Sequence, residues 1–213
     1  MARTHLVWDW NGTLLDDLSL VVESTNAAFA TVGGPRVDAD EHRRAFRRPV
    51  SQFYAEILER AVDDEEFGRL DQIFHDAYRV GLTTIALAAD AKEAITSWPG
   101  GQSLLSMWFH EELVPAVDAY GLSDVFTRVD GLRSGAAGDL KAGHLARHLE
   151  HLGVAGRHTV LIGDSLDDGA AADAVGAASV LYTGGFTDPA RLRASGRPVA
   201  DSLVAAVGLA RSL

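Results

Sequence analysis

The chain has 213 residues, 47% hydrophobic and 23% charged, so it can bury the core of one domain or of a domain with a modest insertion. A formal net charge of −11 argues against nucleic acid and anionic membranes as partners, and the absence of cysteine excludes disulfides and thiolate metal sites. Because no stretch resembles a secretion signal or a membrane span, we expect a soluble cytoplasmic protein.

The first predicted element is a short buried strand that ends in polar residues. An apolar run up to Trp8 leads directly into Asp9, Asn11, Gly12 and Thr13. Such a run, closed by turn residues, is typical of a strand in a parallel sheet, whose carboxyl end is where ligands bind. Asp9 is therefore a candidate nucleophile or metal ligand. The same residue types also close turns and cap helices without any catalytic role.

Helical periodicity then extends over residues 16–89. One helix is predicted over residues 16–33, a second begins with Asp38 as N-cap and Glu41 three residues later, and helical spacing resumes after Pro49. No strand is expected between residues 17 and 100. We therefore predict a helical cap over residues 16–89, inserted after the first strand into an α/β core formed by residues 1–15 and 90–213.

Two arginines of this predicted cap are candidates for binding an anionic group of a substrate. Arg47 and Arg48 precede Pro49 in a locally basic segment, at the point where a cap loop would face the cleft. A solvated helix face is the alternative interpretation for part of this segment.

The remaining sequence alternates between strands and helices, which is typical of a Rossmann-like parallel sheet with helices on both faces. Strands are predicted over residues 102–107, 125–129, 158–163, 179–182 and, at an edge, 199–200. Helices are predicted over residues 88–98, 109–120, 139–152 and 170–175 and at the carboxyl end, with a loop over residues 131–138.

Several chemically active residues fall at the predicted strand ends. Ser106 ends one strand, Asp164 ends another with Asp168 four residues later, and Lys141 lies near the start of a helix. Because the carboxyl ends of parallel strands share one edge of the sheet, we expect these side chains to meet Asp9. Carboxylates suit Mg²⁺, while a lysine and a hydroxyl suit a phosphate group.

With these motifs the sequence resembles the haloacid dehalogenase (HAD) superfamily, in its phosphoglycolate-phosphatase-like branch with a helical cap. The resemblance covers nearly the whole chain. It rests on Asp9-Trp10-Asn11-Gly12-Thr13, on the strand-end Ser106, on Lys141 and on Gly163-Asp164-Ser165-Leu166-Asp167-Asp168.

The resemblance implies a phosphomonoesterase-like hydrolase acting on a small phosphorylated metabolite. Asp9 would form an aspartyl phosphate, and Mg²⁺ would be held by Asp9, the backbone carbonyl of Asn11 and Asp164, with Asp168 supporting the metal or orienting Lys141. Ser106 and Lys141 would bind the transferring phosphoryl group. The expected substrate-binding residues are Gly12, Thr13, Ser106, Met107, Lys141, Arg47 and Arg48.

One position departs from the family pattern. Asn11 stands where related phosphatases have the aspartate that protonates the leaving group, and an amide cannot transfer that proton. Turnover is therefore expected to be slow, or limited to good leaving groups, unless another group such as His110 or Glu111 donates the proton. The alternatives are a non-catalytic protein that binds or carries phosphate, a dehalogenase, or a phosphonatase; the last needs a cap lysine, and Lys92 is the only lysine besides Lys141.

Overall fold

A parallel β-sheet forms the centre of the computed structural model, which describes residues 3–133 and 140–213. Within these residues the sheet has six strands in the order β3-β2-β1-β4-β5-β6. The strands are β1 (His5–Trp8), β2 (Gly101–Phe109), β3 (Val129–Leu132), β4 (Thr159–Gly163), β5 (Ala178–Tyr182) and β6 (Val199–Ala200). The predicted α/β class with a Rossmann-like parallel sheet is confirmed, and β1 lies at its centre between β2 and β4.

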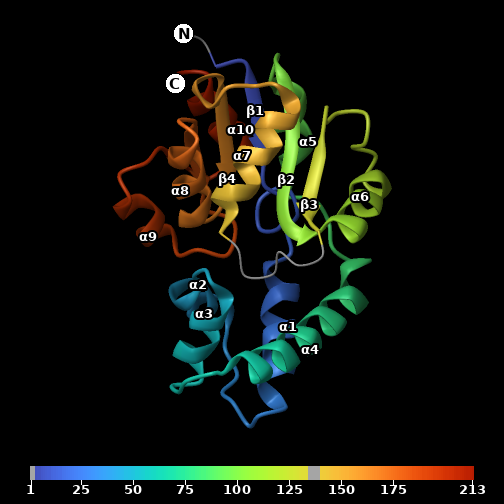
Figure 1. The fold of residues 1–213 in the computed structure, drawn as a ribbon, viewed down its shortest axis with the longest axis vertical. Helices are drawn as coiled ribbons and strands as arrows, with labels where there is room; N and C mark the ends of the chain where they lie inside the picture. Colours follow the sequence, from blue (N-terminus) through green and yellow to red (C-terminus); the bar gives the residue numbers. More distant parts are fainter. Residues whose placement is uncertain (1–2, 134–139) are drawn as a thin grey trace.

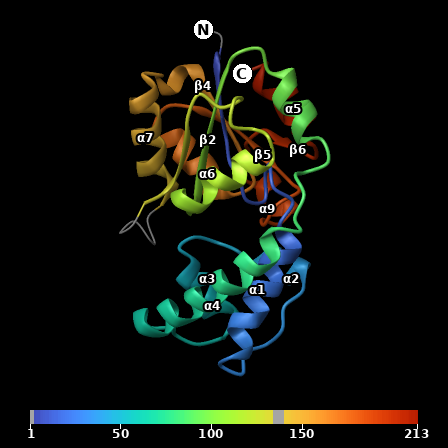
Figure 2. The ribbon, with the colours of Figure 1, turned by 90° about the vertical axis from the view of Figure 1, so that its right-hand side faces the viewer.

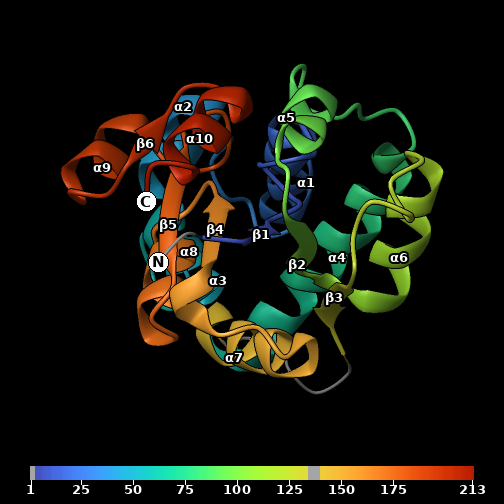
Figure 3. The same cartoon turned by 90° about the horizontal axis from the view of Figure 1, so that it is seen from above.

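Helices cover both faces of this sheet (Figure 3). They are α5 (Ala91–Ser97), α6 (His110–Ala119), α7 (Lys141–Leu152), α8 (Leu166–Ala174), α9 (Pro189–Ala194) and α10 (Leu203–Ala210). Successive side chains of β1 point to opposite faces, so Val7 packs with α7 and α8 while Leu6 packs with α5 and α10. The sheet is therefore buried on both sides, which explains why its central strands are continuously apolar.

Four further helices form a separate layer beyond the carboxyl ends of the strands (Figures 1 and 2). They are α1 (Leu18–Ala30), α2 (Ala39–Ala45), α3 (Val50–Ile57) and α4 (Asp64–Leu82). The layer has its own apolar cluster, which includes Phe29, Phe53 and Leu70. The capping box of Asp38 and Glu41 starts α2 as the sequence predicts. A bridge between Leu15 and Leu87 joins the segments that enter and leave the layer.

The strand predicted over residues 125–129 is wrong. The structure has β3 at Val129–Leu132, so this strand starts where the predicted one ends and occupies part of the predicted loop. Val125 lies in a turn whose N–H donates to the carbonyl of Leu122, and Phe126 is buried in the core from that turn. Burial therefore explains the apolar character of this segment without strand pairing. Residues 134–138 of the predicted loop and residue 139, the start of the next predicted helix, lie outside the described residues.

Smaller differences concern helix starts near the sheet edge. The helix predicted over residues 170–175 begins earlier, at Leu166, because Ser165 and Asp168 form a capping box. Helix α9 follows Pro189 and was not predicted; Asp188 caps it by accepting hydrogen bonds from the backbone N–H groups of Ala190 and Arg191. In the described residues, no helix combines the length and the apolar character that a membrane span requires.

The buried His42 predicts a pH-dependent stability. Burial, with the charge of Arg43 adding to it, lowers the pKa of His42 from 6.5 to about 4. Between pH 6.5 and about pH 4 the histidine binds a proton in the unfolded chain but not in the folded chain. The free energy of unfolding therefore falls as pH falls through this range, by about 3 kcal/mol in total. His42→Phe keeps a ring against Phe46 and should reduce this slope, measured by urea unfolding at pH 7 and pH 4.5. An unchanged slope would show that another group causes it.

Candidate active site

The predicted catalytic side chains converge beyond the carboxyl ends of three neighbouring strands. Asp9 follows β1, Ser106 lies near the end of β2 and Asp164 follows β4. Lys141 is the first residue of α7, and its Nζ lies 2.6 Å from Asp9 Oδ1 and 2.5 Å from Asp168 Oδ1. The strand order places these groups together, because β1 pairs directly with both β2 and β4.

Lys141 is a buried ammonium held by two carboxylates. Although burial opposes its charge, the carboxylates of Asp168 and Asp9 raise the pKa of Lys141, which is therefore a fixed cation. Burial also opposes ionisation of Asp168, but the ion pair with Lys141 and the hydrogen bonds from Ser165 keep the pKa of Asp168 below its usual range. The positive charge of Lys141 is thus held beside Asp9 at the edge of the sheet, where it can bind an anionic group.

The carboxylates are not balanced by this single lysine. Burial raises the pKa of Asp9 to about 6, and burial together with the charges of Asp9 and Asp168 raises the pKa of Asp164 well above its usual value. Three buried carboxylates facing one ammonium leave two uncompensated negative charges, which a divalent cation would neutralise.

The residues present fit a hard divalent cation. Carboxylate oxygens of Asp9, Asp164 and Asp168 lie within 4.8 Å of one another. Asp168 already accepts from Lys141 through Oδ1 and from Ser165 through Oδ2, so it orients the lysine, and Asp9 and Asp164 are the better ligands. Oxygen ligands of this kind suit Mg²⁺.

The turn after Asp9 is shaped by its contact with Asp164. Gly12 has φ +70°, and a Cβ there would lie 2.7 Å from Asp164 Oδ2, so both backbone conformation and space require glycine. The carboxylate of Asp164 also accepts hydrogen bonds from Phe186 N (2.6 Å) and from Thr13 Oγ1 (3.4 Å). Gly12 and Thr13, predicted as substrate-binding residues, therefore contact the proposed metal ligand.

The chain is similar in sequence and in fold to several known proteins. A family model described as HAD-hydrolase-like matches residues 136–206. A phosphoglycolate phosphatase from Chromobacterium violaceum is 24% identical over 89% of each chain, and one from Mesorhizobium japonicum is 26% identical over 88% of this chain and 86% of the relative. The solved structure of a haloacid dehalogenase-like protein from Streptococcus pneumoniae, 19% identical, superposes with a TM-score of 0.81 over 97% of each chain.

The chain is therefore similar to haloacid dehalogenase-like proteins. The resemblance to the HAD superfamily, in its phosphoglycolate-phosphatase-like branch, is confirmed, and so is the prediction of a HAD-like hydrolase at this level of detail.

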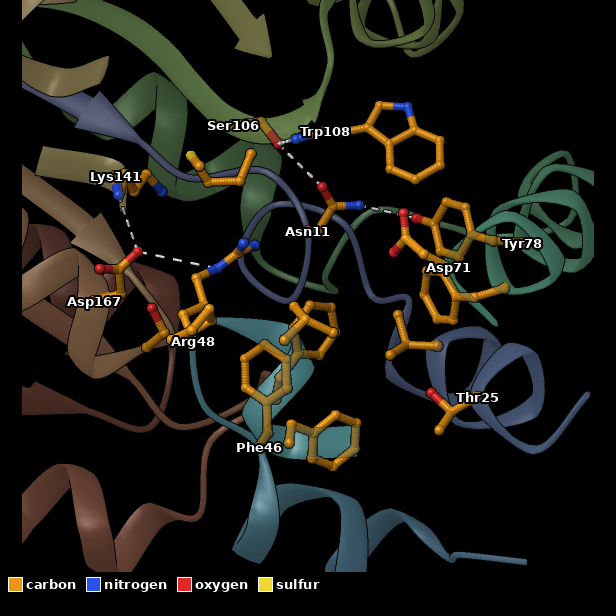
Figure 4. A pocket seen from close by; sticks show the side chains of 18 of the residues that line it. Asn11, Thr25, Phe46, Arg48, Asp71, Tyr78, Ser106, Trp108, Lys141 and Asp167 are labelled. Carbon is orange, nitrogen blue, oxygen red and sulfur yellow. Dashed lines mark hydrogen bonds and ion pairs between the residues drawn. The ribbon is translucent and has the colours of Figure 1, made fainter. Parts of the chain in front are cut away.

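The side chain of Asn11 is fixed by a buried hydrogen-bond network (Figure 4). Its Oδ1 accepts from Ser106 Oγ (3.1 Å), and its Nδ2 donates to Asp17 Oδ2 and to the Tyr78 hydroxyl oxygen, both at 2.9 Å. Tyr78 in turn donates to Asp17 Oδ2 at 2.6 Å, and Gly12 N donates to Asp17 Oδ1 at 2.7 Å. An amide matches these partners because it offers both a donor to Asp17 and an acceptor to Ser106.

Asp17 and Tyr78 are site residues that were not predicted from the sequence. Asp17 is fully buried, and this burial raises its pKa to about 6. The only sequence signal was the pair Asp16-Asp17 before a helix, which is equally typical of a helix start in solvent. The contact with Tyr78 joins residues 61 positions apart, so only the folded chain reveals it.

The other candidates divide into those that reach the cavity at this site and those that do not. Met107 and Arg48 line it, and Arg48 Nε lies 4.0 Å from Asp167 Oδ2. Arg47 is not among the lining residues; it donates to the carbonyl of Ala45 and pairs with Glu56 at 2.5 Å. Its predicted role in substrate binding therefore has no support in this arrangement.

The two alternative proton donors also lie away from the site. His110 accepts a hydrogen bond from Gly131 N at 3.2 Å and contacts Arg133. Neither His110 nor Glu111 lines the cavity, and both belong to the first turn of α6, the simpler interpretation of this segment. Lys92 lies exposed on α5, outside the cavity, which disfavours a phosphonatase.

Proposed function

We propose that this protein is a Mg²⁺-dependent hydrolase of small phosphorylated metabolites that acts through an aspartyl phosphate on Asp9. The observation that carries the proposal is the convergence of Asp9, Ser106, Lys141, Asp164 and Asp168 at one edge of the sheet. Residues 16–89 would act as the cap that covers this site and excludes water during transfer.

The first chemical step is transfer of the phosphoryl group to Asp9. A carboxylate oxygen of Asp9 forms a bond to phosphorus while the bond from phosphorus to the ester oxygen breaks, and the departing oxygen leaves with the electron pair of that bond. Lys141 and the Ser106 hydroxyl bind the phosphoryl oxygens and stabilise their charge. In the second step water attacks phosphorus and loses a proton to the solvent, and the bond from phosphorus to Asp9 breaks to give inorganic phosphate and the free carboxylate. The oxyanion released in the first step takes a proton from the solvent.

A bound Mg²⁺, held by Asp9, Asp164 and the backbone carbonyl of Asn11, would screen the phosphate dianion from the carboxylates. Position 11 supplies no proton, because an amide does not ionise and Asn11 is already held by Asp17 and Tyr78. The leaving oxygen must therefore depart without a general acid. General acid catalysis typically raises the rate by ~10²–10⁴-fold, so this site lacks that contribution. Esters of acidic alcohols and phenols are the substrates that tolerate this loss.

The test compares p-nitrophenyl phosphate, which has a good leaving group, with ethyl phosphate, which has a poor one. We expect hydrolysis of p-nitrophenyl phosphate in Mg²⁺, its loss in excess EDTA, and recovery when Mg²⁺ is restored. Ethyl phosphate should be hydrolysed slower by at least the ~10²-fold that general acid catalysis is worth. Tight phosphate binding without turnover of either ester would instead support the phosphate-binding or phosphate-carrying alternative.

A further inference from the structure

The cavity at the candidate site has one end lined by Asp9 and Lys141, called here the phosphate end, and this end continues into a region lined by aromatic side chains. The cavity, of about 200 Å³, extends from Asp9 and Lys141 between the sheet and the helical layer. The rest of its lining includes two groups of rings, each of which combines side chains from the helical layer with side chains from the sheet layer. Figure 4 shows Phe46 on the side of the helical layer and Trp108 on the side of β2, the strand to which it belongs.

The first aromatic wall consists of His42, Phe46, Phe53 and Phe186. The ring centroid of Phe46 lies 5.6 Å from that of Phe186, 5.8 Å from that of Phe53 and 5.4 Å from that of His42. Phe186 follows β5, and its backbone N–H is the donor to Asp164. This wall is therefore attached directly to the proposed metal site.

The second aromatic wall consists of Phe74, His75 and Tyr78 of α4 with Trp108 and Phe109 of β2. The ring centroid of Trp108 lies 4.7 Å from that of Tyr78 and 5.2 Å from that of His75. Its backbone N–H donates to Ser106 Oγ, and the Tyr78 hydroxyl belongs to the Asn11 network. Both walls are thus held in register with the groups that would bind the phosphoryl group.

The charges along the cavity disfavour an anionic leaving group. Among the described lining residues the Lys and Arg side chains are Lys141 and Arg48, and both lie against carboxylates at the phosphate end. In the aromatic part the charged lining residue is Asp71, 3.3 Å from His75 Nε2. A carboxylate placed there would meet aromatic faces and another carboxylate, and among the described lining residues no lysine or arginine of the aromatic part would pair with its charge.

We propose, building on the proposed function, that the preferred substrates are phosphomonoesters whose leaving group is an uncharged, ring-bearing alcohol or phenol held between the two aromatic walls. Short carboxylated phosphoesters, such as the substrate in the names of the two relatives, would be poor substrates. Aromatic walls bind a ring through buried apolar area and ring-to-ring contacts. A phenol-like leaving group would also suit a site without a general acid at position 11.

A matched pair of esters separates ring binding from leaving-group chemistry. Ethyl phosphate and 2-phenylethyl phosphate both release an alkoxide and differ in the ring; phenyl phosphate and phosphoglycolate complete the series. We expect kcat/KM with Mg²⁺ to be about ten- to a hundredfold higher for 2-phenylethyl phosphate than for ethyl phosphate, the effect of burying one phenyl group. Phenyl phosphate should exceed both, and phosphoglycolate should not exceed ethyl phosphate. Equal values for the matched pair, or a preference for phosphoglycolate, would overturn the proposal while leaving the hydrolase function intact.

Two non-hydrolysable analogues keep the proposal testable if no ester is turned over. We expect 3-phenylpropylphosphonate to bind about ten- to a hundredfold more tightly than propylphosphonate by calorimetry in Mg²⁺. Phe46→Ala should reduce this ratio, and Val80→Ala, at an exposed site outside the cavity, should leave it unchanged. A ratio near one in the wild-type protein would refute ring binding, whereas a high ratio without turnover would refute only the hydrolase.

Discussion

Asp9→Asn should abolish hydrolysis of p-nitrophenyl phosphate, with a loss in kcat of at least ~10³-fold, because an amide oxygen is a poor nucleophile and cannot form the aspartyl phosphate. The exposed neighbour Asp16 provides the matched control, and Asp16→Asn should retain full activity. Rapid acid quenching followed by mass spectrometry should find a phosphorylated peptide containing residue 9 in the wild-type protein and none in Asp9→Asn.

The same substitution should not cost stability. Burial raises the pKa of Asp9, so its charged form is unfavourable in the folded protein at neutral pH, and an asparagine can still accept the hydrogen bond from Lys141. We expect the Tm of Asp9→Asn in EDTA to equal or exceed that of the wild-type protein. A folded Asp9→Asn variant that keeps its hydrolase activity would leave the pocket in place and remove the proposed mechanism.

Exchanging the side chains at positions 11 and 17 should convert the site into one that hydrolyses poor leaving groups. In the double variant Asn11→Asp/Asp17→Asn, the carboxyl group moves to position 11 and the amide at position 17 can donate to it, so the hydrogen bond that joins the pair is retained. A positioned acid is typically worth ~10²–10⁴-fold, so kcat/KM for ethyl phosphate should rise within that range. p-Nitrophenyl phosphate needs no acid and should change little.

The single variants are the controls for this exchange. Asn11→Asp alone places a half-buried carboxylate at position 11 about 2.9 Å from the buried carboxylate of Asp17 and should lower the free energy of unfolding by about 3 kcal/mol at pH 7.5. The double variant should recover most of that loss, and Asp17→Asn alone should show no gain on ethyl phosphate. If the folded double variant hydrolyses ethyl phosphate no faster than the wild type, position 11 does not face the leaving group.

Local sequence patterns were sufficient for the chemistry at the strand ends. Apolar runs that stop at Asp9 and Asp164 predict strands with carboxylates at their ends, and parallel topology brings such ends to one edge. Lys141 could be placed with them because the start of its helix must also lie near that edge. The one wrong strand, at residues 125–129, shows the limit: Phe126 is apolar for burial in the core rather than for pairing in the sheet.

The sequence alone therefore determined the α/β class and the expected convergence of Asp9, Ser106, Lys141, Asp164 and Asp168, because both follow from residue type, short-range periodicity and parallel topology. The resemblance to the HAD superfamily added that the residue at position 11 is not the usual acid. Only the tertiary structure decided that Arg48 rather than Arg47 reaches the cavity and that aromatic rings of two layers form the walls of that cavity. It also decided that Asp17 and Tyr78 hold the side chain of Asn11. These features depend on contacts between residues far apart in the chain, and no local pattern encodes which buried side chains will meet.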